Sequence, residues 1–189
     1  MSELLDFNGA EQTEFKSKYL EPGNQIVQVT EVSVGKSSQK QTPFLKVTVA
    51  NSEGASCSDN FYLTKDAFEK IYRTSILNLI SAANNIDFEA AKAKLVGVTT
   101  ENIADKLAPV LVGKPFALTI NGEWVYPEDT EKKPFVKAVF ASFTKAVPTG
   151  RISELRFDPS KNIRGKKDEA ATTAPTTPPV SSTASQWGK

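Results

Sequence analysis

Aromatic and cationic side chains are interleaved in two separate parts of the 189-residue sequence. In the first part, Phe44 and Lys46 are two residues apart, so they would point to the same face of an extended strand. In the second part, Trp124 and Tyr126 are followed by a loop that carries two adjacent lysines. Flat rings stack on unpaired bases, at about 1–3 kcal/mol per base, while cations attract the phosphates. Residues of these types at this spacing are therefore suited to binding single-stranded nucleic acid.

The basic residues continue into the last third of the sequence. Between residues 132 and 167 there are ten lysine and arginine residues and two acidic ones, a net charge of +8, although the whole chain carries only +1. Residues 1–24 are acidic, with a net charge of −3. A basic region of this kind can hold a polyanion, while the acidic parts limit nonspecific binding. The alternative is an ordinary solvated surface whose lysines happen to fall late in the sequence.

These patterns predict a nucleic-acid-binding surface made of strand, loop and tail residues. The alternative for the aromatic residues, such as Phe135 and Phe143, is burial in the core, with neighbouring lysines keeping only their charged ends in water. We expect Phe143 to be buried, and Tyr62, Trp124 and Tyr126 to be exposed. The predicted contacts to nucleic acid are Lys36, Lys40, Phe44, Lys46, Tyr62, Trp124, Tyr126, Lys132, Lys133, Lys137, Lys145, Lys161, Arg164, Lys166 and Lys167.

Residues that catalytic sites commonly use are scarce. The sequence has no histidine, which excludes Ser-His-Asp triads, Cys-His dyads and imidazole metal ligands. The single cysteine, Cys57, has no histidine to activate it and cannot form an internal disulfide, which fits a reducing compartment. Three carboxylates at residues 128–131 could hold a cation, but a solvated loop explains them more simply. We therefore predict no enzymatic activity, no metal and no cofactor.

The segment Gly35-Lys36-Ser37 matches only the end of a phosphate-binding P-loop. That motif requires another glycine five residues before Gly35, and Thr30 occupies this position. The motif also requires a helix directly afterwards, whereas a polar segment that ends at Pro43 follows here. The sequence therefore does not predict a nucleotide-hydrolysing site.

Hydrophobic periodicity indicates which elements would position these residues. Three segments rich in β-branched or alternating residues have the short spacing of an antiparallel meander. A helical block follows, which Thr64 would cap and whose first helix would end at Asn84-Asn85. Two strands complete the series, and Lys137 and Lys145 would share a face on the last one. The predicted strands are 26–34, 44–49, 56–63, 114–125 and 135–147, and the predicted helices are 64–83, 88–96 and 101–111.

Three strands, a helical block and two further strands are the chain order of an OB-fold, a five-stranded Greek-key barrel. We therefore predict a mainly β, α+β fold: an OB-fold-like barrel with its helices between the third and fourth strands. A generic α+β sheet would have the same order of elements. The predicted domains are an acidic N-terminal extension at 1–24, an OB-like nucleic-acid-binding domain at 25–160 and a C-terminal tail at 161–189.

The predicted tail is rich in Pro, Thr, Ser and Ala and has little apolar surface to bury, so we expect it to be disordered. It begins with four cations that suit phosphate contacts. It ends near Trp187, which would either dock a partner protein or have no role. No apolar run is long enough to cross a bilayer, and no signal peptide is apparent. We therefore expect a cytoplasmic protein that does not bind membranes.

Several short motifs lie between residues 20 and 147. They are Pro22-Gly23 before the first strand, Lys36-Ser37 with Lys40, the segment Pro43–Val47, Phe61–Leu63 before the helix, and Leu111–Pro115 at the fourth strand. Together they resemble phage-encoded single-stranded-DNA-binding proteins. The resemblance implies an OB-fold protein of phage DNA replication and recombination that binds single strands without strong sequence preference. Many members of that family carry an acidic C-terminal tip that recruits partners, whereas this chain ends in Trp187-Gly188-Lys189.

From the residues and the resemblance we expect a non-catalytic protein that coats and protects single-stranded DNA in the cytoplasm of a phage host. Its expected partners are single-stranded DNA and, through the C-terminal tail, replication or recombination proteins. The alternative hypothesis is a structural or cargo protein of a virion, whose basic region contacts nucleic acid or partner proteins. Stoichiometric presence in purified particles, together with weak DNA binding in solution, would indicate this alternative.

Overall fold

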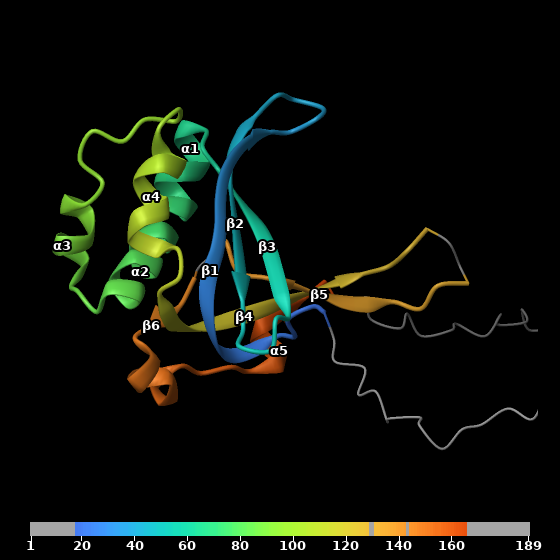
Figure 1. Cartoon of the computed structure of the whole chain (residues 1–189). Coiled ribbons are helices and arrows are strands. Elements are labelled where there is room, and N and C mark those ends of the chain that lie inside the picture. Colours follow the sequence, from blue (N-terminus) through green and yellow to red (C-terminus); the bar gives the residue numbers. More distant parts are fainter. Residues whose placement is uncertain (1–17, 129–130, 143, 166–189) are drawn as a thin grey trace, which may run out of the picture.

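One β-sheet and a layer of helices make up the body of the protein (Figure 1). The computed structural model describes residues 18–128, 131–142 and 144–165. The strands are β1 (Gly23–Lys36), β2 (Pro43–Ala50), β3 (Ser56–Tyr62), β4 (Pro115–Val125), β5 (Phe135–Val139), β6 (Ala146–Val147) and β7 (Ile163–Arg164). The main order is β3-β2-β1-β4-β5, and β6 and β7 also pair with β4. The pairs are antiparallel, apart from β4 with β7.

β1 is long enough to pair with a different neighbour along each half. Its first half, Gly23–Gln28, pairs with β4, and its pairing with β2 runs from Gln28 to Lys36. The register with β2 shifts between Val29 and Glu31, which marks a β-bulge. A bulge bends a strand and increases its twist. β1 therefore curves from the β4 side of the sheet to the β2 side and connects the two.

The inward face of the curved sheet forms the core. On β2, Leu45, Val47 and Val49 are fully buried and the residues between them face outward, which confirms the predicted alternation. On β3, Phe61 is fully buried and Tyr62 is 36% exposed, and the latter confirms the predicted exposure of Tyr62. A slip of one residue would move every apolar side chain of a strand into water, so burial fixes the register. The other face of β2 and β3 is left to solvent.

The helical layer lies beside one part of the sheet (Figure 1). It consists of α1 (Lys65–Ala67), the π-helical turn η1 (Phe68–Tyr72), α2 (Arg73–Asn84), α3 (Phe88–Ala93) and α4 (Ile103–Leu111). α4 packs on β1, and α2 packs on β4 and β6. Thr64 precedes α1 as predicted, although its side chain makes no capping hydrogen bond. Asn85 ends α2 with a left-handed φ of 49°, which confirms the predicted stop. None of the described helices has the length and apolarity to span a membrane.

The prediction of one strand at 135–147 is wrong, because the chain leaves the sheet in the middle of this range. β5 and β6 cover only its two ends. In the segment between β5 and β6, the backbone N–H groups of Phe140 and Ala141 donate hydrogen bonds to the Asp59 carboxylate of β3, at 2.8 and 2.9 Å. These N–H groups are therefore unavailable to a neighbouring strand. The segment turns inward instead, and Phe140 is fully buried.

Two further expectations depend on that range. Lys137 lies on β5 but Lys145 lies directly before β6, so the two do not share a strand face as predicted. Phe143, which we expected in the core, lies outside the described residues. The sheet is also open, because β3 and β5 are its two edges and do not pair along their described lengths. Side chains connect these edges, as where Cys57 Sγ donates to the Ala138 carbonyl oxygen at 3.3 Å.

The described chain continues across both predicted domain boundaries. Before β1, Leu20 is only 4% exposed, and the backbone of residues 18–20 hydrogen-bonds to Ser56. After β6 come the 3-10 helix η2 (Thr149–Glu154), helix α5 (Pro159–Asn162) and β7. The predicted start of the tail at residue 161 therefore falls inside α5. The rest of the predicted tail, from residue 166, lies outside the described residues.

Candidate nucleic-acid interface

The outward face of β2 and β3 carries two aromatic rings in one row. Gly35 of β1, Phe44 of β2 and Tyr62 of β3 are opposite one another in the strand register. The Phe44 ring lies over Gly35, where an added Cβ atom would be only 2.7 Å from Phe44 Cζ. Phe44 and Tyr62 make an edge-to-face contact, with ring centroids 6.2 Å apart and an interplanar angle of 73°. Glycine at position 35 therefore allows the Phe44 ring to lie close to the sheet.

Lysines surround these rings. Lys46 is half-buried on β2, and Lys36 at the end of β1 and Lys40 in the β1–β2 loop are exposed. Hydrogen bonds within residues 37–42 hold the loop in shape. Lys40 and Tyr62 line a hollow of about 470 Å³ that lies between the loop and the start of the helices. We call the surface formed by these residues the β2–β3 face: Lys36, Lys40, Phe44, Lys46 and Tyr62.

A third ring, Tyr72, extends the row toward the helices. It ends the π-helical turn η1, and its centroid is 6.2 Å from that of Tyr62 and 5.7 Å from that of the buried Phe61. Partial burial raises the pKa of the Tyr72 hydroxyl, so this group is neutral at physiological pH. π-helical turns are frequent at functional sites. Helical spacing groups Tyr72 with core residues, which is why the sequence pattern missed it as a candidate for stacking.

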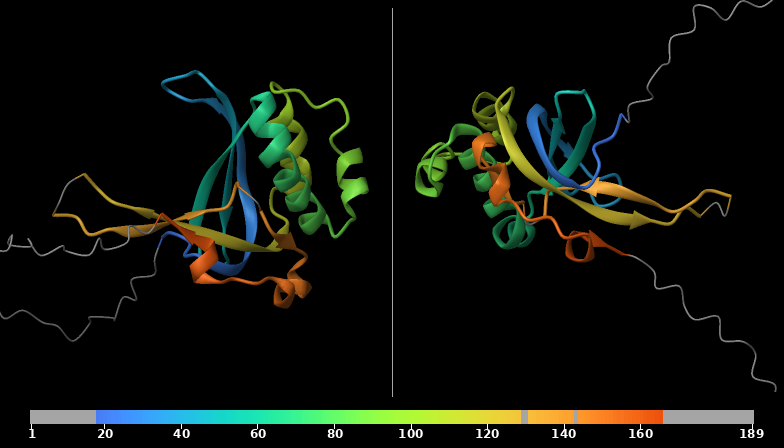
Figure 2. Two further views of the ribbon diagram at one scale, coloured as in Figure 1. Left: turned by 180° about the vertical axis from the view of Figure 1, so that it is seen from behind. Right: turned by 90° about the horizontal axis from the view of Figure 1, so that it is seen from below.

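β4 and β5 extend beyond the body as a hairpin, which we call the arm (Figure 1, Figure 2). Trp124 and Tyr126 pack against each other on the arm, with ring centroids 6.2 Å apart and planes tilted by 30°. Both are half-buried, whereas we expected them to be exposed. Lys132 and Lys133 are exposed in the loop of the arm. Lys137 is exposed on β5, directly opposite a glutamate of β4 that offsets its charge.

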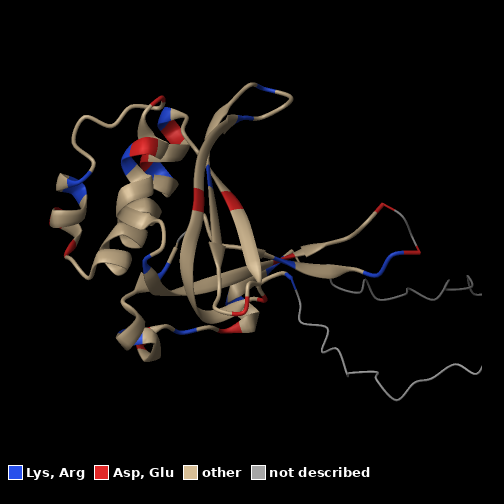
Figure 3. Cartoon of the chain, viewed as in Figure 1, with Lys and Arg blue, Asp and Glu red and all other residues tan. Residues whose placement is uncertain are grey.

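The other described candidates lie elsewhere, on the outward face of β4. Lys145, Lys161 and Arg164 line a hollow of about 350 Å³ together with Arg156, which the sequence prediction did not include. We call this site the β4 hollow. It shares no lining residue with the hollow beside Tyr62. Figure 3 shows cationic segments on the β1–β2 loop, on the arm and in the C-terminal part of the described chain.

The predicted contact residues are therefore divided among three places rather than gathered in one patch. The β2–β3 face and the β4 hollow lie on opposite sides of β1 in the strand order, and the arm extends from β4 and β5. Three predicted residues lie outside the described part of the chain: Lys166, Lys167 and the candidate docking residue Trp187.

Metal ligands and reactive thiols are two common components of catalytic sites. Among the described residues there is no group of three or more acidic, cysteine or histidine residues that could bind a metal. Cys57 is buried, and burial raises the pKa of its thiol to about 12, so the thiol is protonated and unreactive at neutral pH. Gly35 and Lys36 end a strand and are followed by a turn, not a helix, which confirms that this segment is not a P-loop. The arrangement is suited to noncovalent contacts: stacking on rings and attraction of phosphates.

Comparison with known proteins gives no family for this chain. No protein-family model matches it, and no curated protein matches it significantly. The resemblance of residues 20–147 to phage proteins consequently remains an expectation.

Proposed function

We propose that this protein is a non-catalytic single-stranded-DNA-binding protein that coats and protects single strands during DNA replication or recombination. The observation that carries the proposal is the row of Phe44 and Tyr62 on the β2–β3 face, with three lysines around it. Stacking on such rings contributes about 1–3 kcal/mol per base and tolerates every base, because each base has a flat face. Binding would therefore have little sequence preference.

We further propose that the sheet is an OB-type barrel. The strand order supports this, since β3 and β5 are the two edges and the helices lie between β3 and β4 in the chain. Cys57 and Asp59 of β3 bind backbone groups of Ala138, Phe140 and Ala141, so side chains connect the edges that strand pairing joins in a closed barrel. OB-folds bind oligonucleotides on strands 2 and 3 and on the adjoining loops. The β2–β3 face and the arm correspond to those positions.

In the proposed complex, a strand lies across β2 and β3 with its bases toward the sheet. One base stacks on Phe44 and the next on Tyr62, whose ring lies beside Tyr72. The phosphates between these bases lie near Lys40 and Lys46. A paired helix hides the faces of its bases from such rings, so the arrangement selects single strands over duplex.

Oligonucleotide titration tests the proposal. We expect the full chain to bind an oligo-dT of about 24 nucleotides (dT24) at least tenfold more tightly than a duplex of equal length, because the rings cannot reach paired bases. Fluorescence of Trp124 and Trp187 reports binding. Equal affinity for both forms, or none for either, would contradict the proposal. An absence of binding together with stoichiometric presence in purified virions would instead favour a structural role.

The arm gives a separate prediction. Replacing Lys132 and Lys133 with alanine should flatten the slope of log affinity against log salt by about 1.4, because each phosphate contact on single strands contributes about 0.7. Replacing Trp124 with leucine should lower the affinity but leave the slope nearly unchanged, since stacking releases no counterions. Titrations with dT24 at several salt concentrations measure both quantities. An unchanged slope in the double lysine variant would remove the arm loop from the proposed site.

A further inference from the structure

The β4 hollow has the composition of an anion-binding site. Four cations and the single carboxylate of Asp158 line it, a net charge of +3. A hollow whose walls carry mostly one sign of charge concentrates the electric field and attracts ligands of the opposite sign. The cations are Lys145, Arg156, Lys161 and Arg164, and the uncharged lining residues are Thr119, Asn121 and Asn162.

Hydrogen bonds and packing hold the walls of the hollow against the sheet. Asn24 of β1 donates from Nδ2 to the carbonyl oxygen of Leu155 at 3.1 Å, and the Leu155 side chain is only 6% exposed. Asn162 of α5 donates from Nδ2 to Asn121 Oδ1 of β4 at 2.6 Å. β7 pairs with β4 immediately afterwards, which fixes the backbone of Arg164 beside the sheet. The segment that carries the cations is therefore positioned before a ligand binds, which lowers the entropy cost of binding.

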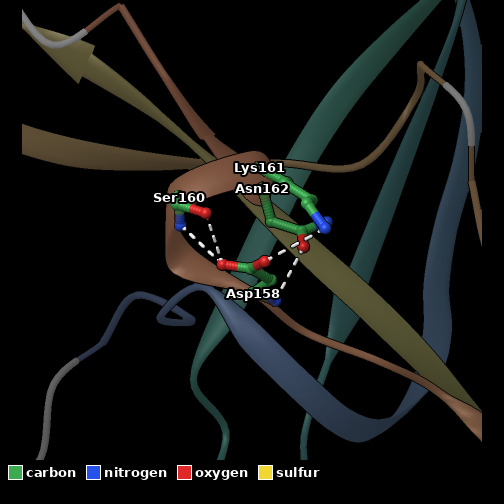
Figure 4. Close-up of polar contacts among 4 residues, drawn as sticks. All are labelled: Asp158, Ser160, Lys161 and Asn162. Atoms are coloured by element: carbon green, nitrogen blue, oxygen red, sulfur yellow. Dashed lines mark hydrogen bonds and ion pairs between the residues drawn. The ribbon is translucent and has the colours of Figure 1, made fainter.

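The one carboxylate of the hollow, that of Asp158, already has polar contacts with residues of α5 (Figure 4). Asp158 Oδ1 accepts hydrogen bonds from the backbone N–H of Ser160 at 3.0 Å and from its hydroxyl at 2.6 Å, and these bonds lower the pKa of Asp158. Asp158 Oδ2 lies 3.5 Å from Lys161 Nζ. By contrast, Lys145 and Arg156 form no ion pair with any carboxylate in the described part of the chain. Their charges are therefore available to an anion.

We propose that the β4 hollow binds the backbone phosphates of the same DNA strand that lies on the β2–β3 face. This inference rests on the proposed function and adds a second contact to it. Phosphate is the favoured anion because two of the four cations, Arg156 and Arg164, are arginines. A planar guanidinium donates two parallel hydrogen bonds to a phosphate, which an ammonium cannot do.

β1 sets the distance between the two contacts. Asn24 is opposite Thr119 at the β4 hollow, and Gly35 is opposite Phe44 on the β2–β3 face. Eleven residues of extended strand span about 36 Å, which is an upper limit for a curved strand. At about 3.4 Å per nucleotide in a stacked strand, roughly ten nucleotides connect the two contacts. An oligo-dT of five nucleotides (dT5) therefore occupies one contact at a time, whereas dT24 occupies both.

The test compares dT24 with dT5 in two double variants. In Lys145→Ala/Arg156→Ala, the ratio of dT24 affinity to dT5 affinity should fall about tenfold, because a second linked contact no longer adds to the first. The salt slope for dT24 should flatten by about 1.4. The matched control is Lys94→Ala/Lys106→Ala, which removes two exposed cations from the helical layer and should preserve the ratio. Thermal melting checks that both variants fold. An unchanged ratio in the first variant overturns the inference even if dT5 still binds.

A second measurement separates this inference from the proposed function. Inorganic pyrophosphate, which has phosphate oxygens but no base, is titrated into the full chain while NMR follows the side-chain Nε–Hε signals of arginine. The signals of Arg156 and Arg164 should shift together, and dT24 should displace the pyrophosphate. Pyrophosphate that dT24 does not displace would identify a free phosphate compound as the ligand and overturn the inference. If neither oligonucleotide binds, the proposed function fails, and so does the inference that one DNA strand contacts both sites. In that case, the changes that pyrophosphate causes in the arginine NMR signals show whether the hollow binds anions at all.

Discussion

Replacing Asp59 with alanine is expected to lower the free energy of unfolding by about 3 kcal/mol. Asp59 Oδ2 accepts the N–H groups of Phe140 and Ala141, residues that are 0% and 2% exposed, and Oδ1 accepts the N–H of Asn60 at 2.9 Å. A buried N–H without an acceptor costs about 1–3 kcal/mol, and bonds to a charged acceptor are stronger than neutral ones. The loss would weaken the connection between β3 and the end of β5.

Urea unfolding followed by circular dichroism measures this effect. Asp59→Asn keeps one oxygen acceptor without the charge, so it should cost about half as much. Asp66→Ala is the matched control, because that side chain is 91% exposed and its carboxylate forms an exposed ion pair with Lys70, at 3.8 Å. The control should unfold like the unaltered protein. If Asp59→Ala also unfolds like the unaltered protein, the carboxylate does not hold the two edges together.

The regular strands could be predicted because burial along a strand has a period of two. On β2, the alternation of Leu45, Val47 and Val49 with more polar residues identifies both the strand and its inward face. The end of α2 could also be predicted from the local sequence, because asparagine, here Asn85, readily adopts the left-handed conformation that ends a helix. Lys40 and Tyr62 line the same hollow because the β1–β2 loop carries Lys40 and the neighbouring strands β2 and β3 place Tyr62 near that loop.

The break between β5 and β6 could not be predicted in this way. Residues 135–147 are rich in β-branched and aromatic residues throughout, which is typical of one continuous strand. The break depends on Asp59, which is 81 positions away from Phe140 in the sequence. Nothing in the residues around Asp59 indicates which backbone groups it would bind. A long-range contact of this kind leaves no local periodicity.

The β4 hollow was missed for a different reason. The pair Asp158-Pro159 is a typical helix start, with a capping side chain followed by proline, and it could have extended the predicted domain beyond residue 160. That extension would have placed Lys161 in an ordered element. The separation of the hollow from the β2–β3 face, however, depends on how far β1 curves between its two partners, and residue types alone do not determine this curvature.

Removing the rings of the β2–β3 face is expected to produce the largest loss of DNA affinity. Phe44→Leu and Tyr62→Leu each remove one stacking surface, which is worth about 1–3 kcal/mol per base, or about 5- to 150-fold in affinity. Leucine retains apolar contact with the sheet, so the fold should persist. The salt slope should stay the same, because neither change removes a cation. Titration of each variant with dT24 at several salt concentrations measures both effects.

The position of the Phe44 ring, as distinct from its presence, can be tested through Gly35. In Gly35→Ala the new Cβ would lie 2.7 Å from Phe44 Cζ, closer than real Cβ contacts, so the ring must move. This variant should weaken dT24 binding in the unaltered chain but have little further effect when combined with Phe44→Leu, a coupling that a double-mutant cycle measures. Tyr19→Leu is the control, since that residue is 79% exposed and its backbone pairs with Ser56, at the opposite end of β3 from Tyr62. Equal losses from Gly35→Ala in both backgrounds, or a comparable loss from Tyr19→Leu, would mean that Phe44 does not stack on a base.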